Sequence, residues 1–525
     1  MQSMKNRSEL YAALGLSLAL SVITLIPYLY AQQLAEPAIF SGFLINPIDG
    51  FSYLAKMRQG AEGAWLFQLP YAPEPGSGAF VFVFFLFLGR VAGWMGVPLL
   101  TVFHATRILV VACMGMVTFL FFRLVLPGGR VRWIATILAL FGSGLGWMAL
   151  SVGIQASDLS IPESIPFLLA YSNAHFPLAA ALMLGGVLLV LSDGRVELRV
   201  LSGLACGVLL GLVQPFSVFS LAVFLGVWLV WEMRQGGREG GAASLWANYK
   251  SRILPFLALM LGALPWLVYD FWLTQTHPAL SAWSLQNKTP SPPLISYIFG
   301  YGLILLLAVI GTYLKKPYRS SHGRLLVAWV VSNAVLLYAP FNLQRRLTLG
   351  LFFPLAGLAA LGIDHLVKRR RRVIPVLLVV LLFSVPSNLL VMSAGLAGVS
   401  RGEPAVVHSR DEINAYEWLK ENAPSGALVL AAPDTGNRLP AFANLRVLYG
   451  HPFETPDAET QEALVRSLYA STAGIEEASL LLNSQGVDYI FFGERERELG
   501  EPPWLEKLPQ VFQSGKVEIH EVVRP

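Results

Sequence analysis

Asp49 is the first residue whose type and position suggest chemistry. It lies in the stretch NPIDGFSYLAKMRQG (46–60), which follows the first long apolar run of the chain. A carboxylate at a membrane surface can act as a general base toward a hydroxyl group. The alternative is structural, because an acid just before FSYLAKMRQ would stabilise the N-terminal end of a helix through the helix dipole.

Arg107 is the second such residue, because it lies inside an apolar run at 99–122. His104 precedes it by three residues, so the two side chains share one face of a helix. An arginine within a membrane span is costly and usually faces a partner or a polar cavity. We expect Arg107 either to bind a lipid phosphate, with His104 beside it, or to form a structural ion pair.

Arg345 and Arg346 form a pair in FNLQRRLTLG (341–350), a loop that the charge pattern described below places outside the membrane. Arginine pairs can bind a phosphate group bidentately. The structural alternative is an anchor at the membrane interface that contacts lipid headgroups.

A second external loop, ASDLSIPESIPFLLAYSNAHFP (156–177), brings four more polar side chains to the outer end of a span. These candidate substrate-binding residues are Asp158, Glu163, Asn173 and His175. Each of them could instead cap a helix or lie at the surface.

Several kinds of site are missing from the sequence. It contains no Gly-rich phosphate loop, which argues against direct use of cytosolic ATP. It also has no metal-spaced cluster of His and Cys and no Ser-His-Asp signature. We therefore expect no cofactor, and the pattern does not indicate a divalent metal. Cys113 and Cys206 both lie in apolar runs and are expected to be core residues.

The elements that would position these residues are membrane helices. The chain of 525 residues is 55% hydrophobic and only 14% charged, whereas soluble proteins have about 25% charged residues. Apolar runs of about twenty residues recur along most of the chain, which indicates a polytopic α-helical membrane protein. The first run (11–30) is long enough to span and is interpreted as a retained helix rather than a signal peptide.

The distribution of Lys and Arg predicts the orientation of these helices. Basic residues precede the first span and recur in loops near 123–132, 195–199, 234–252, 315–324 and 368–372. The positive-inside rule places these loops and the N-terminus in the cytoplasm. The assignment is consistent only if the segment 79–96 does not cross the membrane. We expect it to be an interfacial or re-entrant helix, broken by Gly89, Arg90 and Gly93, which leaves about eleven spans.

Residues 399–525 differ in character from residues 1–398. Residues 401–525 contain 11 Lys and Arg against 20 Asp and Glu, whereas residues 1–400 contain 27 against 13. An amphipathic helix pattern (DEINAYEWLKEN) occurs with short strand-like runs (ALVLAA, RVLYG, VDYIFFG). We expect a soluble extracytoplasmic α/β domain after a transmembrane domain that contains the first external loop (31–98).

Together these features resemble the GT-C superfamily of membrane glycosyltransferases, such as bacterial protein O-mannosyltransferases and aminoarabinose transferases. Asp49 matches the aspartate in the family's first external loop, 79–96 matches its surface helix, and Arg107 resembles an arginine near the start of its second span. The second loop lacks an Asp-x-Asp or Met-Leu-Asp motif, and EPGSG (74–78) stands where some members have Pro-Pro-Leu.

The resemblance implies an inverting hexosyl- or pentosyltransferase of the cell membrane. The donor would be a polyprenyl-phosphate-linked sugar and the acceptor a glycan, lipid or protein; membrane lipids are further partners and nucleic acid is not. Asp49 would be the general base, and Arg345 and Arg346 would stabilise the leaving phosphate. Two alternatives are a transporter or flippase of lipid-linked sugars, and a non-catalytic membrane scaffold.

Overall fold

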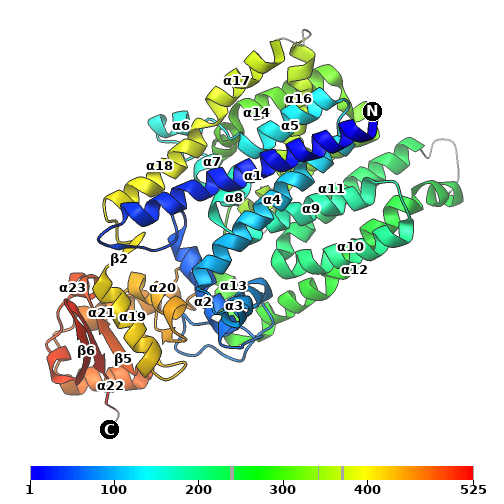
Figure 1. Ribbon diagram of the computed structural model, residues 1–525. Helices are drawn as coiled ribbons and strands as arrows, with labels where there is room; N and C mark the ends of the chain where they lie inside the picture. Colours follow the sequence, from blue (N-terminus) through cyan, green and yellow to red (C-terminus); the bar gives the residue numbers. More distant parts are fainter. Residues whose placement is uncertain (1, 237–241, 341, 368–371, 524–525) are drawn as a thin grey trace. The chain divides into compact units, whose positions relative to one another are not determined.

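The computed structural model describes residues 2–236, 242–340, 342–367 and 372–523 (Figure 1). Arg238 and the first four residues of the predicted basic run at 368–372 lie outside this part of the chain. The described residues fall into two compact units. One comprises residues 1–27, 104–268 and 289–394, and the other comprises residues 28–103, 269–288 and 395–525. We call them the helical unit and the loop–tail unit.

The helical unit is built mainly from long apolar helices, with the short helix α6 among them. Four helices, α1, α4, α12 and α18, also contribute residues to the loop–tail unit. The bounds of the helices of this unit are α1 Gln2–Leu34, α4 Leu99–Val125, α5 Gly129–Phe141, α6 Gly146–Ala149, α9 His175–Leu191, α10 Val196–Val213, α11 Pro215–Gly236, α12 Ala242–Thr276, α14 Leu294–Lys315, α15 Ser321–Leu336, α16 Phe352–Leu366, α17 Val373–Ser384 and α18 Pro386–Ser400. Shorter helices α7 (Ser157–Ser160) and α8 (Pro166–Ser172) lie in the second predicted external loop.

The number of helices long enough to cross a membrane is close to the prediction. Within the described residues, eight helices are long and apolar enough, and a ninth is obtained if the bent pair Gly129–Phe141 and Gly146–Val152 counts as one span. The two other predicted spans are shorter helices, α9 and α15. The sequence therefore predicted the helical membrane architecture correctly, while the count of eleven stays a prediction.

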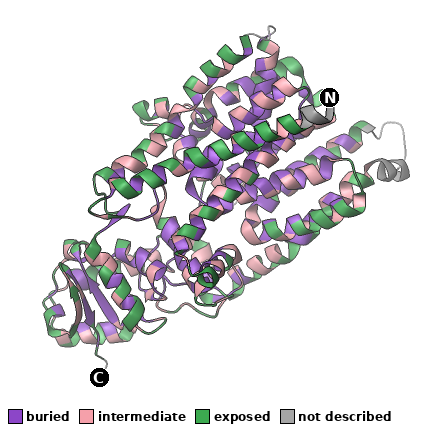
Figure 2. Cartoon of the chain, in the orientation of Figure 1, coloured by how far each residue is buried: buried purple, intermediate pink, exposed green. Residues whose placement is uncertain are grey.

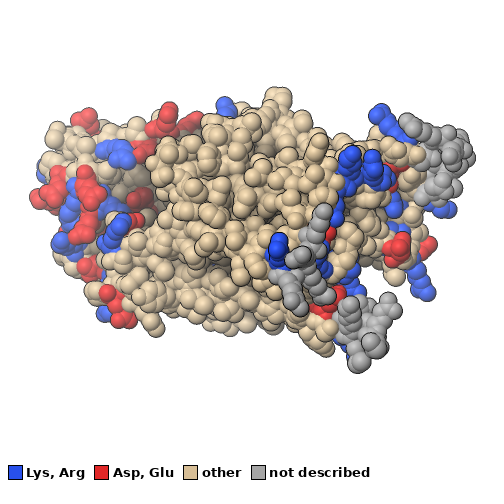
Figure 3. Space-filling model, turned by 90° about the horizontal axis from the view of Figure 1, so that it is seen from above, with Lys and Arg blue, Asp and Glu red and all other residues tan. Residues whose placement is uncertain are grey.

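Ion pairs between helix ends support the predicted grouping of the basic loops. Lys315 and Arg130 both pair with Asp364, and Arg252 and Arg324 both pair with Glu232. Apart from Arg252, which lies inside α12 (Ala242–Thr276), these residues lie at helix ends that the positive-inside rule assigns to the cytoplasm. The face of this unit seen in Figure 3 has a broad band without charged side chains, and Lys and Arg side chains gather at one end of it.

In the loop–tail unit, the first predicted external loop forms two packed helices. These are α2 (Pro47–Ala61) and α3 (Val83–Met95). The prediction that Gly89, Arg90 and Gly93 break the second of them is wrong, because α3 is continuous through all three. A Cβ atom at Gly89 would lie 1.8 Å from the carbonyl oxygen of Met57. The glycine is therefore needed for the close approach of α3 to α2 rather than for a bend.

The C-terminal residues of this unit form an α/β domain with a five-stranded mixed sheet. Its strands are β3 (Leu428–Leu430), β4 (Arg446–Val447), β5 (Tyr489–Phe492), β6 (Gln510–Ser514) and β7 (Val517–Glu521), in the order β4-β3-β5-β7-β6. The first three in this order are parallel, and β7 and β6 are added antiparallel. A separate pair joins β1 (Ile39–Phe40) to β2 (Val407–His408).

Helices cover both faces of this sheet, which explains why its central strands are apolar throughout. Successive strand residues point to opposite faces. Val429 and Phe491 therefore pack with α19 (Arg410–Asn422) and α20 (Pro433–Phe442). Leu430 and Ile490 pack with α21 (Ala458–Ala470) and α22 (Ile475–Gln485). Figure 2 shows the central strands as buried and the outer faces of the helices as exposed.

Two further helices complete the loop–tail unit. They are α13 (Pro278–Gln286) and α23 (Glu494–Leu499). The predicted helix DEINAYEWLKEN is α19, and it begins with a capping box in which Ser409 and Glu412 each bond to the other's backbone N–H. The expected α/β character of the tail is confirmed by these elements.

Candidate functional site

Asp49 lies in the first turn of α2, on the same face as two other polar side chains. Ser52 and Lys56 follow it by three and seven residues, a spacing that aligns side chains along one side of a helix. Pro47 begins the helix, where its missing N–H costs nothing. The negative charge of Asp49 in the first turn also stabilises α2 through the helix dipole, which is the structural role considered for this residue from the sequence. The Asp49 side chain is 46% exposed, so it is accessible to a ligand.

The Asp49 carboxylate contacts a histidine from the C-terminal domain. His451 Nε2 lies 3.3 Å from Asp49 Oδ1, and the His451 side chain is only 3% exposed. The other ring nitrogen, Nδ1, accepts hydrogen bonds from the backbone N–H groups of Phe453 and Glu454. Because Nδ1 is an acceptor, the proton of the neutral ring is on Nε2, which donates to Asp49. The histidine thus orients the carboxylate.

A buried ion pair lies on the same face of α2. Lys56 Nζ is 2.8 and 2.9 Å from the two carboxylate oxygens of Glu454, and Ser52 donates a hydrogen bond to one of them. Lys56 is also surrounded by aromatic rings, with Phe82 at 4.4 Å. Burial favours the neutral form of Glu454, but the charge of Lys56 and the hydrogen bonds from Lys56 and Ser52 outweigh it and lower the pKa of this carboxyl.

The start of α2 is held in place by α20. Tyr71 donates a hydrogen bond to the carbonyl oxygen of Asn437, and the Asn437 amide donates to the carbonyl oxygen of Ile48, next to Asp49. Burial, and then the charge of Glu454, raise the pKa of Tyr71 well above its usual range, so its hydroxyl stays protonated. The absence of a side chain at Gly450 lets the Tyr71 ring pack close to the backbone there, since a Cβ atom at Gly450 would lie 2.5 Å from the ring.

Four residues of this constellation were not predicted from the sequence as site residues: Ser52, Lys56, His451 and Glu454. The i, i+3, i+7 spacing of Asp49, Ser52 and Lys56 is a signal that could have identified one half of it. His451 is 402 positions from Asp49, and no local pattern links the two.

Arg107 and His104 lie in the helical unit, on α4. Arg107 is fully buried, and its guanidinium donates to the carbonyl oxygens of Ala170, at 2.8 Å, and Tyr171, at 3.3 Å. Both carbonyl groups belong to the last turn of α8, where the helix itself supplies no N–H group to bond them. Arg107 Nε also lies 3.3 Å from His104 Nδ1. The contacts of Arg107 named here are therefore with backbone carbonyl groups and with His104, and its role in binding a phosphate stays a prediction.

The polar residues of the second predicted external loop are buried in the helical unit. Asp158 accepts hydrogen bonds from the backbone N–H groups of Gly144 and Gly146, at 3.0 and 3.2 Å. Burial raises the pKa of Asp158 to about 6. Glu163, in a 3₁₀ turn (Pro162–Ser164), lies 4.0 Å from Arg346. The structure thus brings Glu163 and Arg346 together, as it does His104 and Arg107.

Arg345, Asn173 and His175 complete the predicted set. Arg345 and Arg346 belong to the 3₁₀ helix Gln344–Thr348, and the Arg346 guanidinium lies 5.5 Å from the centre of the Phe216 ring. Asn173 and His175, at the entrance to α9, are 2% and 6% exposed. The Asn173 amide nitrogen is buried and has no hydrogen-bond partner within the described residues.

No metal site is found in the part of the chain that the structure describes, where no group of three or more His, Cys, Asp or Glu side chains is arranged to hold an ion. Asp49, His451 and Glu454 do not form such a group, because Glu454 is directed to Lys56.

Comparisons with known proteins agree on the fold. No family model and no curated protein matches the chain. The oligosaccharyltransferase AglB from Archaeoglobus fulgidus, in the apo form, has a TM-score of 0.58 and 12% identity, over 94% of this chain and 71% of that one. ArnT from Cupriavidus metallidurans, bound to undecaprenyl phosphate, has a TM-score of 0.53 and 13% identity, over 97% and 98%. The mycobacterial arabinofuranosyltransferase AftD has a TM-score of 0.54 and 17% identity, over 99% and 42%.

Proposed function

Because the chain has the GT-C-like fold of these three proteins, we propose that it is a membrane glycosyltransferase. It transfers a hexose or pentose from a polyprenyl-phosphate-linked donor to a hydroxyl group of a glycan, lipid or protein on the outer side of the membrane. The observation that carries this proposal is Asp49, an exposed carboxylate at the start of a short surface helix, oriented by a buried histidine.

The proposed reaction is a single displacement. The Asp49 carboxylate accepts the proton of the acceptor hydroxyl, and the hydroxyl oxygen attacks the anomeric carbon of the donor. The bond from that carbon to the phosphate oxygen breaks, and the polyprenyl phosphate leaves with the electron pair from the opposite face. The anomeric configuration is inverted, and Asp49 later releases its proton to water. General base catalysis of this kind contributes about 10²–10⁴-fold to a rate.

His451 supports this role of Asp49 through its Nε2–H group. A hydrogen bond to one carboxylate oxygen fixes the direction of the other, which is what a base needs in order to meet an incoming hydroxyl. The buried Lys56–Glu454 pair holds the loop that contains His451, since Glu454 follows it by three residues. The C-terminal domain thereby supplies a positioning residue to the first external loop.

The residues of the helical unit are assigned separately. Arg345 and Arg346 are proposed to bind the phosphate of the donor, because a guanidinium group matches the geometry of phosphate oxygens. Asn173, with its unpaired amide, and His175 are proposed to bind the sugar or the phosphate. Asp158 and Glu163 are proposed to stabilise the second external loop (156–177) rather than to bind the substrate, because Asp158 accepts backbone hydrogen bonds and Glu163 pairs with Arg346.

The proposed orientation follows from the basic loops. The N-terminus is in the cytoplasm of the cell, and the first loop and the C-terminal domain are outside it. Donors of this class have a lipid tail, so a site at the membrane surface suits them.

Sugar transfer in proteoliposomes tests the function. Wild type is supplied with radiolabelled polyprenyl-phosphate sugars and native membrane lipid extract, and product is separated from donor. Label in a new product, absent with Asp49→Asn and present with the matched exposed acid Glu74→Gln, supports the enzyme. The same vesicles are tested for movement of donor lipid across the bilayer. Movement without transfer would favour the transporter instead, and neither activity with any donor would favour the scaffold.

A further inference from the structure

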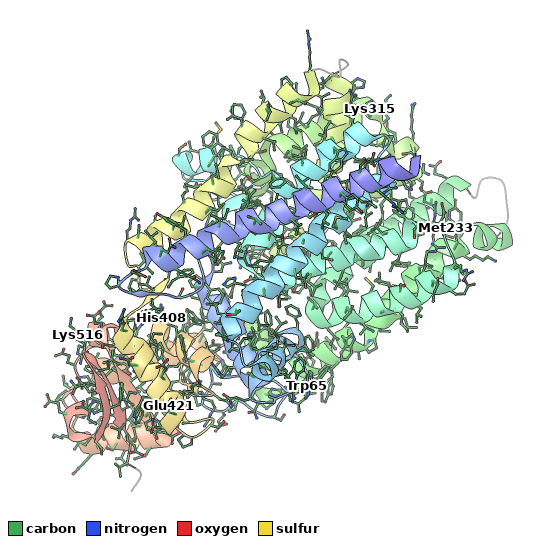
Figure 4. All side chains as sticks on the ribbon, in the orientation of Figure 1. Trp65, Met233, Lys315, His408, Glu421 and Lys516 are labelled. Atoms are coloured by element: carbon green, nitrogen blue, oxygen red, sulfur yellow. The ribbon has the colours of Figure 1, made fainter. Side chains whose placement is uncertain are left out.

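A cavity of about 640 Å³ lies in the helical unit, among helix ends that the proposed reaction does not use. Its walls come from the end of α4, the start of α5, the end of α14, the start of α15 and the last turns of α16. All of these ends carry the basic loops that the positive-inside rule places in the cytoplasm. Figure 4 marks the position with Lys315, at the end of α14.

The cavity is strongly positive. Its lining contains four cations, Arg130, Lys315, Lys316 and Arg319, and one carboxylate, Asp364, so its net charge is +3. Asp364 pairs with Arg130 and with Lys315. Lys316 and Arg319 are exposed and form no ion pair within the described ranges of the chain. Two cations are therefore held by one carboxylate, and two more are left to bind an anion.

The backbone adds to this preference for an anion. Helix α5 begins at Gly129 in the cavity wall, and its N-cap, Gly128, has no side chain with which to cap the first N–H groups. The N-terminal end of a helix attracts negative charge. The 13 residues of α5 make this a full helix rather than a single turn.

The rest of the lining is apolar. Leu126, Val131, Leu326 and Leu361 all contribute to it. Inorganic phosphate has no apolar part that such a wall could contact. A ligand with a phosphate group attached to hydrocarbon satisfies both parts, and basic pockets between membrane helices at the cytoplasmic side bind anionic lipid headgroups.

We propose that this cavity is a binding site for the phosphodiester headgroup of an anionic phospholipid of the inner leaflet. Lys316 and Arg319 contact the phosphate, and the apolar wall contacts the upper part of an acyl chain. The site would join α4, α5, α14, α15 and α16 at one membrane face. It does not depend on the proposed sugar transfer, because none of its residues belongs to the Asp49 constellation.

Lipid binding to the purified full-length protein tests this proposal. Dioleoylphosphatidylglycerol and dioleoylphosphatidylethanolamine are titrated separately into detergent-solubilised protein, and the bound lipid is measured by native mass spectrometry. Lys316→Gln with Arg319→Gln is compared with Arg195→Gln and Arg234→Gln. The second pair removes the same charge from exposed positions at other basic loops of the same unit.

We expect wild type to retain phosphatidylglycerol in preference to phosphatidylethanolamine. A basic residue near a lipid phosphate contributes about fivefold to affinity, so the cavity double variant should lose about 30-fold for the anionic lipid. The control double variant should stay within about twofold of wild type. Equal losses in both variants would mean general charge attraction and would overturn the site. So would displacement of the lipid by millimolar inorganic phosphate alone, which would make a free anion the ligand.

Discussion

The buried pair Lys56–Glu454 offers the sharpest prediction about how the Asp49 site is held. The side chains are 1% and 12% exposed, with Nζ and Oε1 2.8 Å apart. At an effective dielectric constant of about 20, this distance gives an attraction of about 6 kcal/mol, part of which offsets the desolvation of both charges. Lys56→Met removes the partner and leaves Glu454 buried as an uncompensated charge. Breaking a buried pair in this way costs about 3–5 kcal/mol.

The loss should be visible as a fall in the apparent melting temperature at a fixed scan rate. A cost of about 3–5 kcal/mol corresponds to about 6–20 °C for a folding unit of about 150–250 residues. Lys516→Met is the matched control, because Lys516 pairs with Glu494 at 2.9 Å but the two side chains are 75% and 70% exposed. Figure 4 marks Lys516 in the turn before β7. That variant should shift the melting temperature little, since exposed pairs contribute about 0–1 kcal/mol.

The double variant Lys56→Met with Glu454→Gln separates charge from packing. It removes both charges and keeps an oxygen that can accept the Ser52 hydrogen bond. Most of the lost stability should return, because the cost of the single variant is mainly the unpaired carboxylate. The reasoning fails if Lys56→Met behaves like Lys516→Met, or if the double variant is as unstable as the sum of the two single variants.

Three further predictions concern other parts of the chain. His451→Ala should slow sugar transfer by about 10–100-fold with a smaller effect on donor affinity, because it frees the Asp49 carboxylate to rotate; equal rates would remove His451 from the mechanism. Burial, and then the charges of Arg438 and Arg495, lower the pKa of His408, so only the unfolded chain takes up a proton there below pH about 6.5. The free energy of unfolding should therefore fall from pH 7.5 to 5.5, with a slope of up to about 1.4 kcal/mol per pH unit, and the melting temperature should fall with it. This pH dependence should lessen in His408→Phe. Arg107→Met should leave its carbonyl partners unsatisfied and lower the yield of folded protein, whereas a pure substrate ligand would affect only transfer.

Periodicity and composition were sufficient to predict the helical membrane architecture, because each helix that spans a membrane needs its own run of about twenty apolar residues. Apolar runs located the helices, and the change in charge after residue 400 located the α/β domain. The hairpin β6–β7 was not predicted, although β7 (VEIHE) alternates apolar and polar residues; β6 (QVFQS) does not. Gly89 was interpreted as a break because a glycine that ends a helix and a glycine that lets two helices approach look alike in one sequence.

Only part of the candidate site could be predicted from the sequence in the same way. Asp49 was found because it follows the first apolar run and matches the aspartate of the resembled family's first external loop, and Arg345 and Arg346 because they oppose the charge trend. Lys56 was not predicted as a site residue, although aromatic rings and a carboxylate bury it. Its partner Glu454, and His451 three residues before Glu454, come from a loop almost four hundred residues away. A contact between such distant positions cannot be predicted from the hydrophobic periodicity of one sequence.

The claim that Asp49 is the general base is tested most directly by Asp49→Asn in a single-turnover transfer assay. The variant should bind the polyprenyl-phosphate donor as wild type does and melt within a few degrees of it, because the amide keeps the size of the side chain and an oxygen for His451. Its rate of transfer should fall by about 10²–10⁴-fold. Transfer at the wild-type rate by the folded, donor-bound variant would contradict the account and leave Asp49 as a residue that stabilises the start of α2.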